Sequence, residues 1–445
     1  MNTLESLLQK IDENISCTTE LDKYYRGEQP LAFLSPEAKA ALGSRFGVLC
    51  SNIPRVQITS LAERLRITGF AGADIWADWI RCDMDQLSGV AHREALLLGD
   101  SYVSVWARNG RPSVAIESSR QVAVQRDPAT RQVVAAVKRW ADEQAQCTWA
   151  VLYLPDRIVR YRATTIGATI AGFEQVETIP NPLGVVPLVP LSNTDMLLSE
   201  RGTSEIADLI PLVNAMNKVL ADMLVGSEYY ARPRRYATGL ELEERPKLDA
   251  DGLPVVDLDT GEPLMEAVSP FGEGDRMLVN EDAAGKFGSL PAADLGAYEA
   301  AVRVLTAQIM AVSALPAHFL GQLTQQPTSA DALRAAEASL TARAEARQAT
   351  FGRAWEQVGR LIVAVRDGVD PASVDVRVQW ADAATRSVAQ EADAVTKLFA
   401  AGLLPASFAL AKLGYSDDEI TQIRTARRQE ALDGAGVDLR QIAAS

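Results

Sequence analysis

Apolar residues recur at three- and four-residue steps over residues 204–230, a spacing that is typical of an amphipathic helix. Ser204 is placed to cap the start of this helix, and Gly226 and Pro233 are expected to close it. At roughly 1.5 Å per residue, a helix of about 27 residues is about 40 Å long. We therefore expect a rod that serves as a scaffold element for the rest of the 445-residue chain.

The same spacing predicts further helices over residues 3–25, 74–99, 294–314 and 330–367. The last of these is the longest. It is rich in alanine and contains no proline, and Gly352 and Gly359 are expected to be its weak points.

Two regions, one near each end of the chain, contain residues that typically begin or end helices. Ser35-Pro36-Glu37 is expected to begin a helix that Asn52-Ile53-Pro54 breaks. A short strand over residues 55–59 and a helical segment over residues 60–65 are predicted next. At the other end, three helical pieces are expected, separated at residues 402–405 and 414–416.

Between about residues 100 and 165 the apolar period changes to two, which predicts an antiparallel meander of strands. The proline-rich residues 181–191 are expected to form an extended connector, and residues 373–380 form one more strand. Residues 236–292 are acidic and rich in glycine and proline, which indicates a module of loops and brief strands. Together these elements predict the α+β fold class.

The net charge is −14, from 44 basic and 58 acidic residues, which argues against a basic groove that grips nucleic acid. The four cysteines are far apart, so reduced thiols are expected. The first residues lack the apolar core of a signal peptide. The sequence pattern shows no apolar run of about 20 residues, so we expect a soluble intracellular chain without a membrane partner.

Candidate catalytic chemistry is sparse. His92 and His318 are the chain's two histidines, and their surroundings predict a polar or helix-surface role. No phosphate-binding loop or nucleophile elbow is present, and the acid pairs in residues 249–259 are expected to be solvated turn carboxylates. We therefore predict no catalytic residue, cofactor or metal. An enzyme that uses carboxylates stays as an alternative.

One cluster of basic and aromatic residues follows the central helix. It contains Arg232, Arg234 and Arg235 with tyrosines at 229, 230 and 236. Arginine and tyrosine can stack on bases or hold phosphates. Basic side chains at a helix C-terminus can equally satisfy its last carbonyls, and the acidic character of the chain favours this second interpretation.

The order of these elements resembles the portal proteins of tailed double-stranded DNA bacteriophages, especially those of siphophages that infect actinobacteria. The stretches that carry the resemblance are residues 21–46, 60–70, 91–106, 181–191, 204–239 and 329–361. They span about four-fifths of the chain in the family's order.

The resemblance implies a portal fold with wing, helical stem, clip and crown regions, assembled as a ring. The implied regions are an N-terminal wing (1–203), a stem helix (204–230), a clip (231–292), a second stem helix (293–315), a tunnel loop (316–329), a long helix with a return to the wing (330–390) and a C-terminal crown (391–445).

The resemblance also implies a role. The ring, expected to be a dodecamer, would lie at one capsid vertex of the virion after assembly in the host cytoplasm. Double-stranded DNA would pass through its channel during packaging and ejection. The implied partners are terminase, a major capsid or scaffold protein, and a head-completion adaptor. A minor head or adaptor protein that forms no ring is the main alternative.

Two sets of residues follow from these regions. The implied tunnel loop carries neutral polar side chains that would face DNA: Gln322, Thr324, Gln325, Gln326 and Thr328. An ordinary solvated connector is the alternative for this loop. The implied clip and subunit contacts are Arg232, Arg234, Arg235, Glu241, Glu243 and Glu244.

Overall fold

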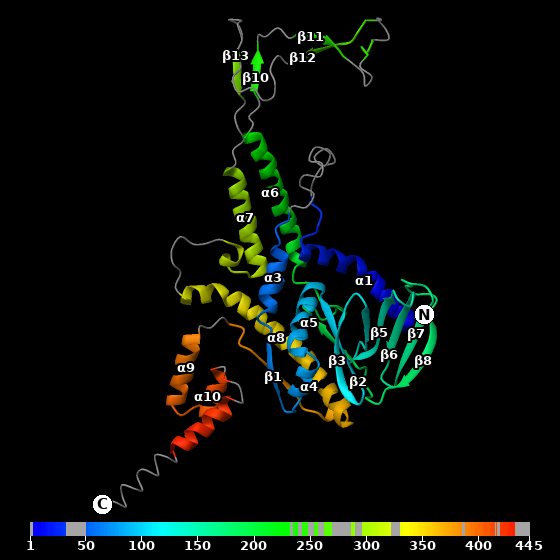
Figure 1. Cartoon of the computed structure of the whole chain (residues 1–445), viewed down its shortest axis with the longest axis vertical. Coiled ribbons are helices and arrows are strands. Elements are labelled where there is room, and N and C mark those ends of the chain that lie inside the picture. The colour runs from blue at the N-terminus through cyan, green and yellow to red at the C-terminus, as the bar shows by residue number, and fades with distance from the viewer. Residues whose placement is uncertain are drawn as a thin grey trace, which may run out of the picture. The chain divides into compact units, whose positions relative to one another are not determined.

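The computed structural model describes residues 3–32, 50–231, 235–238, 243–247, 253–256, 262–268, 286–289, 296–321, 330–384, 388–413, 415 and 419–431. The chain divides into two compact units, which we describe separately (Figure 1). The sheet unit contains Met1–Ile15, Ile58–Ser204 and Leu315–Ser445, and the paired-helix unit contains Ser16–Gln57 and Glu205–Ala314.

The helices are α1 (Thr3–Arg26), α3 (Ile53–Ala62), α4 (Trp76–Arg81), α5 (Met84–Leu98), α6 (Ile210–Ala231), α7 (Gly296–Ser313), α8 (Ala330–Asp367), α9 (Val388–Ala400) and α10 (Ala406–Lys412). Short 3₁₀ turns are η1 (Ala207–Leu209), η2 (Ala317–Leu320) and η3 (Pro371–Ser373). The strands of the sheet unit are β1 (Ile67–Ala71), β2 (Asp100–Arg108), β3 (Arg111–Ser118), β4 (Val122–Arg126), β5 (Val133–Asp142), β6 (Cys147–Tyr153), β7 (Arg157–Ala163), β8 (Glu174–Pro180), β9 (Leu188–Ser192) and β14 (Arg377–Trp380).

The predicted meander is confirmed as β2 to β7, but it is divided between two antiparallel sheets. One sheet has the order β3-β2-β9, and the other has the order β4-β5-β6-β7-β8. The sequence pattern did not predict β8, because nearly all its residues are exposed and it therefore lacks an apolar alternation. Apolar residues of α1 pack on the five-stranded sheet, with Leu8 and Ile11 in the same core cluster as Val137 and Leu152.

Residues 181–191 are not helical, as predicted, but their last four residues belong to a strand and not to a connector. Residues from Leu188 onward form β9, which pairs with β2 in the register Ser104↔Leu188. β9 is an edge strand, and an edge strand tolerates Pro190 because one side of its backbone needs no partner in the sheet.

The long helix α8 begins at Ala330 and ends at Asp367, as predicted, and it packs against β2, β3 and β9. Its two interior glycines serve the packing of β14. A Cβ atom at Gly359 would lie 2.8 Å from Val376 Cγ1, and one at Gly352 would lie 3.2 Å from Val378 Cγ1. The predicted strand over residues 373–380 is confirmed for β14, which pairs with β1.

Two local predictions near the N-terminal end of the sheet unit are wrong. Residues 55–59 are part of helix α3, because Pro54 fits the first turn of a helix and buried Ile58 and Leu61 have helical spacing. The predicted helix over residues 74–99 is interrupted at Asp83, whose φ of 56° separates α4 from α5. The helix expected after Ser35 lies outside the described residues.

The C-terminal region follows the prediction. α9, α10 and a helical segment over residues 419–431 are the three expected pieces. Gly402, with a φ of 70°, lies in the turn between the first two of them.

Candidate functional site

The paired-helix unit runs out and back as one long hairpin. α6 and α7 pack against each other, and the strands that follow α6 and precede α7 are also paired (Figure 1). β10 (Arg235–Thr238) pairs with β13 (Lys286–Ser289), and β11 (Glu243–Pro246) pairs with β12 (Met265–Val268). The prediction of brief strands in residues 236–292 is therefore confirmed for these segments.

The two helices meet along a stripe of mixed polarity. Val213, Met216, Asn217 and Ala221 are buried on α6, and Thr306 and Ile309 are buried on α7. The hydroxyl of Thr306 donates to the carbonyl of Val302 in its own helix, 2.8 Å away. The buried stripe on each helix thus has the three- and four-residue spacing on which both helices were predicted.

The end of α6 at Ala231, before Pro233, agrees with the predicted end at residue 230, whereas its start and the role of Gly226 differ from the prediction. η1 precedes α6, so regular helix begins at Ile210 and not near Ser204. The helix also continues through Gly226 to Ala231, because one glycine inside a helix costs only about 1 kcal/mol relative to alanine.

Side chains anchor the first half of α6 within the paired-helix unit. The Oδ1 atom of Asn217 accepts hydrogen bonds from the backbone N–H and the hydroxyl of Ser51, each at 2.8 Å. The hydroxyl of Tyr24 donates to Asn214 Oδ1 at 3.0 Å. Asn217 is buried and Ser51 is half-buried, so both hydrogen bonds between them are largely shielded from water.

Asn217→Ala should therefore reduce the free energy of local opening in this unit by about 1 kcal/mol, because it removes two hydrogen bonds to the half-buried Ser51. Hydrogen exchange of the α6 amides and the Ser51 amide measures this loss. Lys218→Ala is the matched control, because it removes only a partly exposed i,i+4 ion pair with Asp222. Equal exchange rates in the two variants would show that the Asn217–Ser51 contact does not hold the helix.

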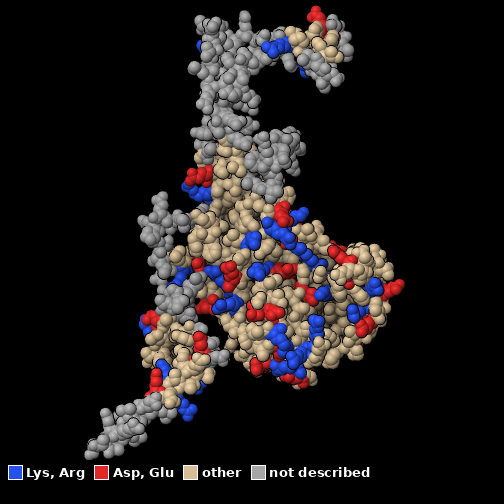
Figure 2. All heavy atoms as spheres, in the orientation of Figure 1, with Lys and Arg blue, Asp and Glu red and all other residues tan. Residues whose placement is uncertain are grey.

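Much of α6 is apolar and only half-buried in its own chain. Residues Ala207–Ser227 are long and apolar enough to cross a membrane by length and composition, yet only 28% of that window is buried. The expectation that no segment meets these criteria is therefore wrong. The visible faces of α6 and α7 are mainly uncharged, as Figure 2 shows. Val304 on α7 is also exposed, so both helices present apolar surface that their own unit does not cover.

The predicted site residues are only partly described. Arg235 lies on β10 opposite Ser289, and Glu243 and Glu244 lie on β11 opposite Val268 and Ala267. The others lie outside the described residues: Arg232, Arg234, Glu241, Gln322, Thr324, Gln325, Gln326 and Thr328.

The predicted polar or helix-surface role holds for His318 and is wrong for His92. His92 lies in the core of the sheet unit, and its Nε2 atom accepts a hydrogen bond from Trp355 Nε1 at 2.8 Å. Burial lowers the pKa of His92 to about 3, so it is neutral. His318 lies in η2, with Nε2 at 3.3 Å from Glu337, which also pairs with Arg64 at 2.8 Å. In the described stretches, no group of three or more His, Cys, Asp or Glu residues is placed to hold a metal.

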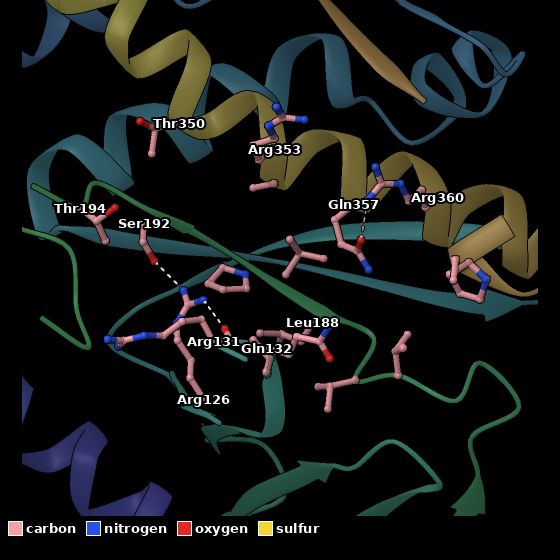
Figure 3. Close-up of a pocket in the computed structure, with 18 of the residues that line it drawn as sticks. Arg126, Arg131, Gln132, Leu188, Ser192, Thr194, Thr350, Arg353, Gln357 and Arg360 are labelled. Carbon is pink, nitrogen blue, oxygen red and sulfur yellow. Dashed lines mark hydrogen bonds between the residues drawn. The ribbon is translucent and has the colours of Figure 1, made fainter. Parts of the chain in front are cut away.

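The sheet unit contains a large groove between α8 and β9, with a volume of about 1020 Å³ (Figure 3). Four arginines line it. Arg126 donates to Ser192 Oγ at 3.2 Å and to the carbonyl of Arg131 at 3.4 Å, while Arg353 pairs with Glu356 and Arg360 donates to Gln357. Sequence reasoning missed this groove because its residues come from separate segments that only the fold brings together.

The groove has a lining of mixed polarity. It contains the carboxylates of Glu200 and Asp375, and three of its four arginines are engaged by neighbouring side chains or carbonyls. Basic and acidic side chains are also interspersed on the visible face of the sheet unit (Figure 2). This part of the molecule therefore offers a mixed polar surface.

Comparisons with known proteins agree on one family. The family model described as phage portal protein, SPP1 Gp6-like, matches residues 34–432. A portal protein of Mycobacterium phage L5 is 30% identical over 409 residues, covering 86% of this chain and 80% of that protein. A portal protein of Mycobacterium phage D29 is 29% identical over 457 residues, covering 97% and 89%.

A solved structure supports the same fold. A chain from the neck of an empty GTA particle has a TM-score of 0.50 at 13% identity, covering 90% of this chain and 93% of that one. At this identity the likeness concerns the fold alone.

Proposed function

Because the chain belongs to the SPP1 Gp6-like family of phage portal proteins, we propose that its copies form a closed ring around a channel for double-stranded DNA. Family membership confirms the resemblance to the portals of phages that infect actinobacteria. Membership of this family indicates a structural role for the chain in the phage particle. Ring formation, the passage of DNA through the channel and the partner proteins named below are our proposals.

The observation that carries the ring is the partly accessible apolar surface of α6. Only 28% of the apolar window is fully buried and most of its other residues are half-buried, so a neighbouring copy can still remove apolar area from water. Apolar area removed from water contributes about 25 cal/mol per Å². Neighbouring copies that pack their α6 and α7 side by side would bury this surface, and head-to-tail contacts of this kind close into rings.

The charge of the chain suits a conduit. A basic channel wall would hold DNA at many phosphates and slow its passage. With a net charge of −14, this chain has little overall attraction for a polyanion. DNA can therefore move through a ring of such chains without being held.

We assign the proposed regions as the resemblance implies. Residues 204–230 and 293–315 form the stem, and residues 231–292 form a clip that meets terminase and later the head-completion adaptor. Arg232, Arg234, Arg235, Glu241, Glu243 and Glu244 supply charged contacts in the clip or between subunits. The wing and crown face the capsid or scaffold protein at one vertex of the virion, after assembly in the host cytoplasm.

Images of the purified protein test the ring directly. Negative-stain micrographs should show rings with a central hole, and native mass should be an integer multiple of the 48.0 kDa chain, with twelve copies expected. A monodisperse monomer at high concentration would contradict the proposal. A small complex that binds another portal would instead indicate a non-ring adaptor.

The tunnel loop gives a second test. We propose that Gln325 and Gln326 face DNA together with Gln322, Thr324 and Thr328. Gln325→Lys with Gln326→Lys adds two cations per subunit at this point, and phosphate binding should lower packaged DNA roughly tenfold or more. Quantifying packaged DNA in phage particles measures the effect.

Gln325→Asn with Gln326→Asn is the control, because it keeps two neutral amides in the loop. Rings of both variants should look alike in micrographs. Normal packaging by the lysine variant would remove the assignment of the loop while leaving the ring in place.

A further inference from the structure

Three consecutive apolar side chains project from the loop that follows β9. Met196, Leu197 and Leu198 are 75%, 90% and 88% exposed. We call these three residues the apolar tip. Large apolar side chains this exposed and this close together commonly mark a contact with another molecule.

The loop that carries the tip is tied down at its base. The N–H of Asn193 donates to the carbonyl of Gly99 at 2.8 Å, and the N–H of Thr203 donates to the carbonyl of Asn193 at 2.8 Å. The chain crosses itself closely here, since a Cβ atom at Gly202 would lie 1.9 Å from the carbonyl oxygen of Gly99. A second copy of the chain would therefore meet an anchored surface, which lowers the entropic cost of binding.

Ion pairs hold the two sides of the loop. Asp195 pairs with Arg347 of α8 at 2.9 Å, and Glu200 pairs with Lys10 of α1 at 2.8 Å. These contacts fix the residues on either side of the tip and leave its apolar side chains exposed.

A pocket with an apolar lining, which suits the apolar tip, lies at the other end of the same sheet. It has a volume of about 690 Å³, within the range of pockets that enclose small ligands. Its apolar lining comes from the end of β2, the β8–β9 connection and the end of α8: Trp106, Pro182, Leu183, Ala364, Val365 and Val369. We call this the apolar pocket.

The tip and the pocket lie at opposite ends of the same sheet in the sheet unit. The loop that carries the tip follows Ser192, which pairs with Asp100 at the start of β2. Trp106 of the pocket lies six residues further along β2. At about 3.3 Å per residue this is about 20 Å. Along α8, Arg347 is at the tip's end and Ala364 is at the pocket's end. One copy can thus present its tip to the pocket of the next.

Charged side chains surround both surfaces, and those of the hairpin beside the pocket are basic, although the pocket lining also contains Asp370. Asp195 and Glu200 on the tip's loop have side chains that are more than half exposed. The β2–β3 hairpin beside the pocket carries exposed Arg108 and Arg111, neither of which has an ion-pair partner among the described residues. Such rim charges favour the correct partner and fix the register of docking.

We infer that the apolar tip of each subunit inserts into the apolar pocket of the neighbouring subunit. This inference rests on the proposed ring and assigns one of its subunit contacts. The contact joins two different surfaces, so it repeats in one direction around the assembly and can close into a ring.

Charge substitution tests the contact. Leu197→Glu should raise the protein concentration needed for half-maximal ring formation at least tenfold, measured by native mass over a dilution series. Val369→Lys in the pocket should do the same, and the double variant should recover part of the loss through a new ion pair. Leu197→Met, which keeps an apolar side chain, should assemble at the wild-type concentration.

Crosslinking identifies the partner surface. Leu197→Cys with Val369→Cys, in a Cys17→Ser background, should give a ladder of disulfide-linked oligomers on oxidation, and either single cysteine should give none of these ladders. Unchanged assembly of Leu197→Glu, or wild-type rings without a crosslinked ladder, would overturn the inference while leaving the ring intact. Failure of the wild-type protein to form any ring would overturn the proposed function as well.

Discussion

Trp355→Ala is expected to lower the free energy of unfolding of the sheet unit by about 3–5 kcal/mol, the range for truncating a large buried aromatic side chain. Trp355 is fully buried on α8, with its ring 5.1 Å from that of Trp79 at an interplanar angle of 77°. Truncation would leave a cavity. It would also remove the indole N–H of Trp355, which donates a hydrogen bond to His92 Nε2. The helix would then lose its main contact with α4 and α5.

Urea unfolding followed by tryptophan fluorescence measures this loss. All seven tryptophans of the chain lie in the sheet unit, so the signal reports on that unit alone, and the variant keeps six of them. Trp355→Phe is the control, since it fills most of the space but removes the N–H, and we expect it to cost about 1–3 kcal/mol. If Trp355→Ala unfolded at the wild-type urea concentration, the cluster would not be the core of this unit.

Acidification should destabilise the sheet unit through His92, by about 3 kcal/mol between pH 7 and pH 4. The pKa of His92 falls from 6.5 to about 3 because burial penalises its charged form, and Arg93 adds a smaller effect in the same direction. The carbonyl of Leu65 opposes both. The unfolded chain therefore binds a proton near pH 6.5, whereas the folded chain does so only near pH 3. The contribution of His92 is fully present above pH 6.5 and is lost as the pH falls toward 3.

His92→Gln isolates this effect, because glutamine does not titrate and can still accept a hydrogen bond from Trp355. The wild type should lose about 3 kcal/mol more than His92→Gln over this pH interval, with both measured at one protein concentration. The carboxylates of the chain contribute equally to both proteins. Parallel pH profiles would mean that His92 is already protonated in the folded protein.

The elements with long, regular periods were predictable from the sequence. α8 has its predicted bounds of 330 and 367, and α1 and the strands of the meander lie where the periods of 3.6 and two place them. The family was predictable as well, because the order of several motifs along the chain is a property of the sequence alone. These features depend on neighbouring residues, whose spacing is visible without the fold.

Short elements depended on tertiary contacts. Pro190 made the segment of β9 look unlike a strand in the sequence, yet pairing with β2 makes it one. The helical conformation of residues 55–59 follows from burying Ile58 and Leu61, which outweighs the strand propensity of the same residues. The division of the meander between two sheets likewise depends on which strands meet, and periodicity does not carry that information.

For the functional surfaces, the sequence alone determined the family, the apolar stripe of α6 and the acidic balance of the chain. Only the tertiary structure decided that His92 is a neutral core residue and that Asn217 anchors α6. It also decided that Met196–Leu198 and the pocket beside Trp106 lie at opposite ends of one sheet. The reason is physical: burial, hydrogen-bond partners and the distance between two surfaces arise from segments far apart in the chain, and local spacing does not encode which of those segments meet.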